Sequence, residues 1–354
     1  MTLQALLSRR KASGKELAFF TSQLALLLDS GTSLTEALAA LRDQTDHPAL
    51  REAIEQAEED VKGGKLLSSA LERHPRLFPK LLTSMVRVGE TGGFLTESLQ
   101  RTSQFLLLRQ EVLSKVQAAL AYPVVLVAVS SGVVIFLITA VLPKFIKVFE
   151  GHEDILPLPT KMLMALSGAV TGYWYVFVAV AIGLIAGAVL GLRSPAGKRL
   201  FDRAILRLPL VGSLCRLSVT SRLLRTFGVL IESGVPLLDA VAVTRRTIGN
   251  TEFVRFFDTL EETVQQGGTL SDAFRPSPLF PSAIKQMVTT GEMTGNSGKI
   301  MIKMAEYYEG QVTLRLKSLT AAIEPLVLLV MGSVVGFIAL SLFMPLFRMA
   351  RTVT

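Results

Sequence analysis

The sequence predicts an all-α membrane protein with two homologous helical-bundle domains in tandem and three transmembrane helices. Half of the 354 residues are hydrophobic and the mean hydropathy is +0.46, which is too apolar for an ordinary soluble protein of this length. Three long stretches contain no Asp, Glu, Lys or Arg. The motifs outside those stretches occur twice, in the same order. These observations favour a soluble module that was duplicated together with a membrane span.

The duplication keeps a constant register through most of the module and continues, after a one-residue deletion, into apolar sequence. The matched pairs are Ser30-Gly31 and Ser233-Gly234, Gly64 and Gly267, Phe78-Pro79 and Phe280-Pro281, Gly89-Glu90 and Gly291-Glu292, Gly93 and Gly295, Pro123 and Pro325, and Pro143 and Pro345. The repeated unit is therefore a soluble module followed by a hydrophobic stretch.

Each uncharged stretch is long enough to cross a bilayer, because a helix needs roughly 20 apolar residues to span the hydrocarbon core. The stretches are Val116–Pro143, Met162–Leu192 and Pro325–Phe347. We therefore expect transmembrane helices over residues 116–143, 162–192 and 319–347.

Basic residues beside these stretches predict the orientation. Residues 193–222 contain seven Lys or Arg against the single acid Asp202, whereas residues 144–161 hold three basic and three acidic residues. The positive-inside rule places the basic side in the cytoplasm. We thus expect a periplasmic loop over 144–161 and a periplasmic tail over 348–354, although Arg348 and Arg351 oppose the second assignment.

The cytoplasmic parts are expected to be an N-terminal tail (1–14), a first domain (15–115), a linker (193–217) and a second domain (218–318). The formal charge is +8, and most of the excess lies in the second half. Because the basic cluster begins where a span ends, attraction to anionic membrane lipid explains it better than binding to nucleic acid. Cys215 is the only cysteine, so the sequence predicts no disulfide.

Within each domain, the apolar spacing predicts short helices rather than strands. A helix over residues 16–28 ends near Ser30-Gly31, where glycine can take a left-handed cap conformation. Ser33 and Glu36 form a capping box for the next helix. Pro48 then opens a helix that Gly63-Gly64 stops. The acidic pair Glu58-Glu59 of this helix is expected to lie on a solvated face. The same is expected of Glu261-Glu262 on the matching helix of the second domain.

Phe78-Pro79 opens a further helix, which we expect to break at Gly89, as its counterpart breaks at Gly291. The last helix of each domain begins near Leu95 or Lys299 and leads toward a span. Pro123 and Pro325 occupy the same position near the start of a span, where neighbouring groups must compensate for the missing backbone donor. Glu324 is either a solvated glutamate at the membrane entry or a partner of a polar group on a neighbouring helix.

This ordered set of paired motifs resembles the F-family platform proteins of bacterial type II secretion and type IV pilus assembly. The resemblance runs from about Lys15 to the C-terminus. The residues that carry it are Leu27-Leu28-Asp29-Ser30-Gly31-Thr32-Ser33-Leu34, Phe78-Pro79, Gly89-Glu90-Thr91-Gly92-Gly93-Phe94-Leu95, Tyr122-Pro123, Ser233-Gly234-Val235-Pro236-Leu237, Phe280-Pro281, Gly291-Glu292-Met293-Thr294-Gly295 and Glu324-Pro325.

The resemblance implies a non-enzymatic, multi-pass platform in the bacterial inner membrane. Its implied partners are a cytoplasmic hexameric ATPase, other inner-membrane assembly components, pilins or pseudopilins, and further copies of the chain. It leaves open whether the machine serves secretion, pilus assembly or competence. A repeat-built transporter or channel is the alternative; three spans are few for it, intramembrane charges are nearly absent, and the repeated span is not inverted.

The residues themselves predict no catalytic, cofactor or metal site. Gly63-Gly64-Lys65 lacks the first glycine and the hydroxyl of a P-loop. No two of His47, His74, His152 and Cys215 share a helix face, so a zinc site is not expected. The sequence leaves open whether a calcium ion binds weakly.

Glu90 and Glu292 are the residues to single out. Each carboxylate either caps the start of the final helix of its domain or presents an acidic contact to a partner. The candidate motif and contact residues are Gly31, Gly89, Glu90, Gly93, Pro123, Gly234, Gly291, Glu292, Gly295, Glu324 and Pro325.

Overall fold

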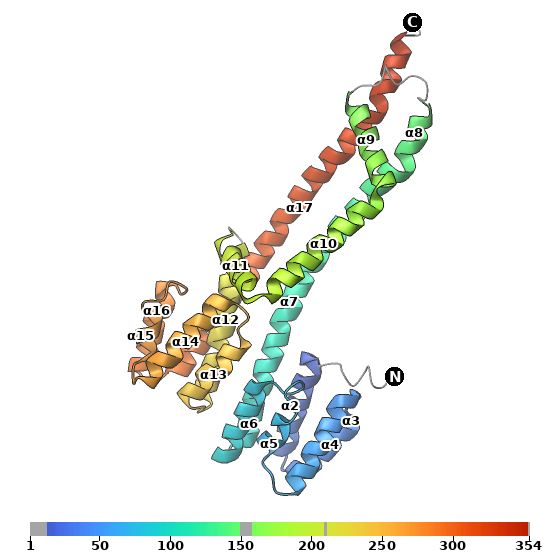
Figure 1. The fold of residues 1–354 in the computed structure, drawn as a ribbon. Helices are drawn as coiled ribbons and strands as arrows, with labels where there is room; N and C mark the ends of the chain where they lie inside the picture. Colours follow the sequence, from blue (N-terminus) through green and yellow to red (C-terminus); the bar gives the residue numbers. More distant parts are fainter. Residues whose placement is uncertain (1–12, 149–157, 209–210, 353–354) are drawn as a thin grey trace. The chain divides into compact units, whose positions relative to one another are not determined.

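The computed structural model describes residues 13–148, 158–208 and 211–352, and every regular element in these ranges is helical (Figure 1). The chain divides into two compact units. Unit 1 comprises residues 1–115 and 202–313, and unit 2 comprises residues 116–201 and 314–354. His152 and the acidic residues of the expected periplasmic loop lie outside the described residues.

Unit 1 contains the same order of helices twice, which confirms the predicted duplication. The first copy consists of α2 (Gly14–Asp29), α3 (Leu34–Gln44), α4 (Pro48–Lys62), α5 (Leu67–Glu72), α6 (Lys80–Gly92) and the start of α7 (Leu95–Phe136). The second copy consists of α12 (Val211–Glu232), α13 (Leu237–Thr247), α14 (Thr251–Gln265), α15 (Leu270–Phe274), α16 (Ser282–Met293) and the start of α17 (Ser297–Thr352).

The helix boundaries follow from the caps and glycines of the sequence. The predicted capping box is present at α3, where the Ser33 hydroxyl accepts from the Glu36 N–H and the Glu36 carboxylate accepts from the Ser33 N–H. Three matched pairs of glycines have φ between 68° and 86°, a conformation that L side chains rarely adopt. These pairs are Gly31 and Gly234, Gly64 and Gly267, and Gly93 and Gly295. The turns of the module are therefore duplicated along with its helices.

The short helices α5 and α15 were not foreseen individually. The second copy carries a readable signal, because Thr269 and Asp272 form a capping box at the start of α15. In the first copy Leu66 stands at the cap position of α5 and supplies no side-chain hydrogen bond. A helix of this length needs tertiary contacts for its stability, so sequence alone is a weak guide to it.

One hydrophobic core runs through both copies, but the two copies fill it differently. The second copy packs phenylalanine rings edge to face, with centroids 4.7 Å apart for Phe256 and Phe280 and 4.8 Å apart for Phe256 and Phe274. At the first-copy positions equivalent to Phe256 and Phe274 stand Ala53 and Leu71, both buried. The duplicated fold thus tolerates either an aliphatic or an aromatic side chain at these two core positions.

Unit 2 contains the apolar parts of α7 and α17 together with η1 (Leu137–Val141), α8 (Leu142–Val148), α9 (Leu158–Gly172) and α10 (Trp174–Arg193); α11 (Pro195–Arg207) follows. Two helical segments of the described chain are long and apolar enough to cross a membrane, over residues 95–145 and 297–344. The first contains the predicted span 116–143, and the second contains the predicted span 319–347 up to residue 344. The second predicted span is divided between α9 and α10 at Tyr173. A third candidate span exists only if α11 and α12 are counted together as one membrane-crossing segment. The two helices meet at an angle of 108°.

The π-helical turn η1 has a local cause in Pro143. In this register Leu142 N–H bonds to the carbonyl of Leu137, five residues back. The next donor would be residue 143, but proline has no N–H to offer the carbonyl of Ile138. Ser167 of α9 donates to that carbonyl at 3.0 Å instead. A polar side chain on a neighbouring helix thus compensates for a proline in an apolar segment.

Candidate functional site

The Gly-Glu motif lies at one corner of each copy, where α6 or α16 packs against the short helix before it. Glu90 of α6 accepts the N–H of Leu67 at 2.5 Å with Oε1 and the N–H of Ser68 at 3.0 Å with Oε2. Both donors belong to the first turn of α5, whose N–H groups have no partners within the helix. The Glu90 carboxylate therefore caps α5, not the final helix of the domain as the sequence suggested.

The second copy repeats this cap. Glu292 of α16 accepts the N–H of Leu270 at 2.7 Å and the N–H of Ser271 at 2.9 Å, and the Ser271 hydroxyl donates to it at 2.5 Å. A carboxylate at a helix N-terminus is favoured by the partial positive charge of the exposed amides. Because each copy has the same arrangement, the motif glutamates have a structural task in both.

The glycine of the motif does not break its helix, which corrects the prediction. Helix α6 continues through Gly89 to Gly92 and ends at the left-handed Gly93. A Cβ at Gly89 would lie 2.5 Å from Cβ of Ser98 and 3.0 Å from Cα of Leu95, and one at Gly291 would lie 3.0 Å from Cα of Ser297. Glycine is therefore needed at these positions because the final helix of each copy crosses there at close range.

Gly234, a motif glycine of the second copy, lies beside the first copy within unit 1. A Cβ at Gly234 would lie 4.0 Å from Cγ1 of Val88, the residue before Gly89. Arg101 Nη1 donates to the carbonyl of Glu232 at 2.9 Å. A half-open groove lies at this contact. The residues that line it are Phe94, Glu97, Ser98, Arg101, Glu232, Ser233 and Gly234. Gly31 has open space around its α-carbon and is not part of this cluster.

Pro123, Glu324 and Pro325 lie in unit 2, apart from the motif corners. Pro123 is inside α7 and Pro325 inside α17. The Tyr122 hydroxyl donates to Glu324 Oε1 at 3.0 Å, and Thr320 Oγ1 lies 3.4 Å from the carbonyl of Ala119. Of the two hypotheses for Glu324, the structure thus supports the second, in which the carboxylate contacts a polar group on a neighbouring helix. This carboxylate links two helices at the matched proline positions.

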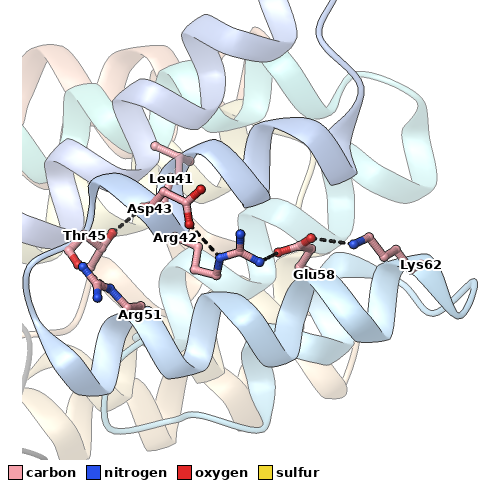
Figure 2. A network of polar contacts seen from close by, with 7 residues as sticks. All are labelled: Leu41, Arg42, Asp43, Thr45, Arg51, Glu58 and Lys62. Atoms are coloured by element: carbon pink, nitrogen blue, oxygen red, sulfur yellow. Dashed lines mark hydrogen bonds and ion pairs between the residues drawn. The ribbon is translucent and has the colours of Figure 1, made fainter.

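Glu58 is buried, so the expectation of a solvated acidic face is wrong at this position. Its carboxylate accepts from Arg42 Nη1 at 2.9 Å and from Lys62 Nζ at 2.6 Å (Figure 2). The first of these pairs joins α3 to α4. The second copy has the equivalent pair, with Arg245 Nη1 3.5 Å from Glu261 Oε2. The sequence did carry a signal for this burial. A helical-wheel plot of α4 places Glu58, the residue after Ala57, at the edge of the apolar face.

An arginine clamp in the second copy was also missed. Arg225 of α12 has a side chain that is 8% exposed. Its Nε and Nη2 donate to the two carboxylate oxygens of Glu309 at 3.1 and 2.7 Å, and Nη1 donates to Glu306 at 3.3 Å. This fork-shaped pairing fixes α12 against α17. Ser22 stands at the equivalent position of the first copy, so the clamp is not part of the repeat.

Potential metal ligands in the part of the chain that the structure describes include His47, which is already engaged in capping a helix. No group of three or more His, Cys, Asp or Glu side chains gathers there in a way that could hold a metal ion. Gly63 ends α4, in agreement with its predicted role as a helix terminator, and His47 caps the start of the same helix through Nδ1. What the motif residues do build is a pair of equivalent packing corners.

Comparison with known proteins identifies the family to which this duplicated helical module belongs. Residues 20–143 and 223–345 each match the family described as type II secretion system (T2SS), protein F. The chain belongs to this family. Each matched segment contains most of one copy of the module and the apolar stretch after it, and the two segments end at the matched prolines Pro143 and Pro345.

Relatives of this chain carry names from two machines. The type IV pilus assembly protein PilC of Thermus thermophilus is 36% identical over 341 residues, which are 96% of this chain and 84% of that protein. The type II secretion system protein F of Xanthomonas campestris is 34% identical over 358 residues, which are 99% of this chain and 87% of that protein. Similarity over nearly the full length in both cases supports one architecture for both groups.

Proposed function

We propose that this protein is a non-enzymatic, multi-pass platform in the bacterial inner membrane. It couples a cytoplasmic hexameric ATPase to the addition of pilin or pseudopilin subunits to a filament, and so serves protein secretion or pilus biogenesis. Its two helical domains, over residues 15–115 and 218–318, face the cytoplasm, and three transmembrane helices anchor the chain. It works as a homo-oligomer alongside other inner-membrane components.

One observation carries this proposal: each soluble copy continues into an apolar segment without a helix break. Helix α7 extends from Leu95 to Phe136 and contains Lys115, the last residue before the first apolar stretch, and α17 extends from Ser297 to Thr352. Up to Pro123 in α7 and Pro325 in α17 these helices contain no proline and resist bending, so a tilt or rotation imposed on a domain would reach the start of the apolar part.

The experiment is to interrupt one connection and follow filament assembly in cells. Lys115→Pro removes a helical hydrogen bond and introduces a clash, which costs about 3 kcal/mol locally and kinks the helix. We expect assembly to stop while the protein remains in the membrane at its normal level. The matched control is Lys115→Ala, which removes the exposed ion pair with Glu111 but preserves the helix, and should assemble filaments normally.

A second measurement identifies the partners. Photo-crosslinkers at exposed positions of both domains, in the native membrane, should capture the ATPase, and those along the apolar segments should capture pilin-like chains. Normal assembly by Lys115→Pro, or capture of neither class of partner, would contradict the platform function.

A further inference from the structure

Helix α11 turns its apolar side away from the protein. No residue of this helix is buried, and the side chains of Leu200 and Phe201 are 70% and 47% exposed. An amphipathic helix at the surface of a soluble domain normally turns its apolar stripe to the core. The exposed stripe of α11 therefore needs an occupant outside the described chain.

The opposite side of α11 is fixed to the second copy. Asp202 Oδ2 accepts the N–H of Thr251, the first residue of α14, at 2.8 Å. Arg203 Nη2 donates to Glu252 at 3.1 Å, and Leu206 packs against the core of unit 1. At 100° per residue these three positions share one side of the helix, so Leu200 and Ala204 lie on the other.

Positive charge borders the exposed apolar side. Lys198 and Arg207 flank it on its two edges by helical spacing, and Arg199 lies on the charged side. None of the three has an ion-pair partner in residues 13–148, 158–208 or 211–352. Lysine and arginine at the edges of an exposed stripe, with Leu and Phe at its centre, are typical of helices that lie in a membrane interface.

The position of α11 in the chain favours a membrane over a protein as the occupant. The apolar helix α10 ends at Arg193, and Ser194 begins α11 directly, since its hydroxyl accepts the N–H of Gly197 at 3.0 Å. If α10 lies in the bilayer, α11 begins within a few ångströms of the headgroups. Basic residues at that level are attracted to anionic lipid.

We propose that α11 lies in the interface of an anionic leaflet, with Leu200, Phe201 and Ala204 inserted among the lipids and Lys198 and Arg207 at the level of the phosphates. The inference rests on the membrane placement proposed above. It gives α11 a lipid-bound side opposite its contacts through Asp202 and Arg203.

The test is a depth measurement on the full-length protein. In a background without the native cysteine (Cys215→Ser), a fluorophore is attached to a single cysteine at position 200, and the protein is reconstituted in phosphatidylglycerol-containing vesicles with brominated acyl chains. Position 184 on α10, where Leu184 is 71% exposed, is the membrane reference, and position 259 on α14, also exposed, is the aqueous reference. We expect quenching at position 200 to be weaker than at 184 and well above that at 259.

The outcomes separate the inference from the proposed function. Quenching at 184 with none at 200 above the level of 259 would leave the membrane placement standing and overturn the lipid contact of α11. A fluorophore at 200 that is shielded from water but unquenched would overturn it in favour of a protein occupant. Absence of quenching at 184 would overturn both.

A charge-matched pair of variants tests the role of the basic residues. Replacing Lys198 and Arg207 by Gln should lower the ratio of docked to undocked α11 about 25-fold, because each such residue near an anionic surface contributes about fivefold. Docking should then need a larger fraction of phosphatidylglycerol. Replacing the exposed residues Lys299 and Lys303 by Gln removes the same charge elsewhere and should leave quenching at 200 unchanged. Equal effects of the two double variants would overturn the headgroup contact.

Discussion

At the residue scale, the motif glutamates are explained by the amides that they satisfy. Glu90 receives two backbone N–H groups of α5, and Glu292 receives the equivalent pair of α15. The two copies differ in what else caps these helices. Thr269 caps α15 with its own side chain, whereas Leu66 gives α5 no such bond. The first copy therefore depends more on its glutamate than the second.

This difference predicts unequal costs for the same substitution. Glu90→Gln should lower the free energy of unfolding by about 1–2 kcal/mol, because a charged acceptor at a helix start is lost. Glu292→Gln should cost less than about 1 kcal/mol, since the Thr269 cap remains. Thermal unfolding of the full-length protein in detergent measures both. Lost filament assembly with an unchanged melting temperature for Glu90→Gln would instead support the proposal of a partner contact.

His74 gives a pH-dependent prediction. Burial lowers its pKa, with a smaller contribution from the neighbouring Arg73, and its Nε2 is buried without a hydrogen-bond partner among the described residues. The folded protein thus binds a proton at His74 less readily than the unfolded chain, whose histidine titrates near about 6.5. Stability should fall as the pH drops below that value, down to the lower pKa of the folded state.

The measurement compares melting temperatures of wild type and His74→Gln from about pH 7.5 to about 5.5. The wild type should lose more stability over this range than the variant. A difference between the two proteins that stays constant with pH would contradict the prediction.

At the scale of elements, the Arg–Glu pair between the second and third helices of the module occurs in both copies with different exposure. In the first copy Glu58 has a side chain only 5% exposed, so Arg42 compensates a desolvated charge. In the second copy Arg245 and Glu261 have side chains 43% and 30% exposed. The same ion pair should therefore matter for packing α3 on α4 much more than for packing α13 on α14.

Arg42→Met should accordingly destabilise the protein by about 2–3 kcal/mol, because it leaves a buried carboxylate with Lys62 alone. Arg245→Met is the matched control and should cost about 0–1 kcal/mol, as is usual for exposed pairs. Chemical unfolding of both variants, with Glu58→Gln added to complete a double-mutant cycle, measures the coupling directly. Equal losses for Arg42→Met and Arg245→Met would show that burial does not decide the effect.

At the scale of the whole molecule, the charge distribution predicts which side of the membrane each segment faces. In the Cys215→Ser background, a cysteine at position 153 in the expected periplasmic loop should react with a membrane-impermeant maleimide in intact spheroplasts. A cysteine at position 246 in the second domain should react only after permeabilisation. Labelling of both positions from the same side would contradict an odd number of spans between residues 153 and 246.

The architecture of unit 1 could be predicted from the residues alone because the duplication made the local signals redundant. The turn at Gly31 is weak on its own, but Gly234 repeats it, and the capping box of Ser33 and Glu36 is a local interaction that needs no tertiary context. Family membership could be recognised for the same reason, since an ordered set of motifs is specific where a single Gly-Glu pair is not.

The contacts of several of those residues, by contrast, depend on how the helices pack against one another. Gly89 looked like a helix break, yet the close crossing of Ser98 and Leu95 requires glycine inside a continuing helix. Glu90 caps a helix whose first residue, Leu67, is 23 positions earlier, and Glu58 is buried because α3 covers it. Local propensity and spacing carry no record of such contacts, because they arise between segments that meet only after the chain has folded.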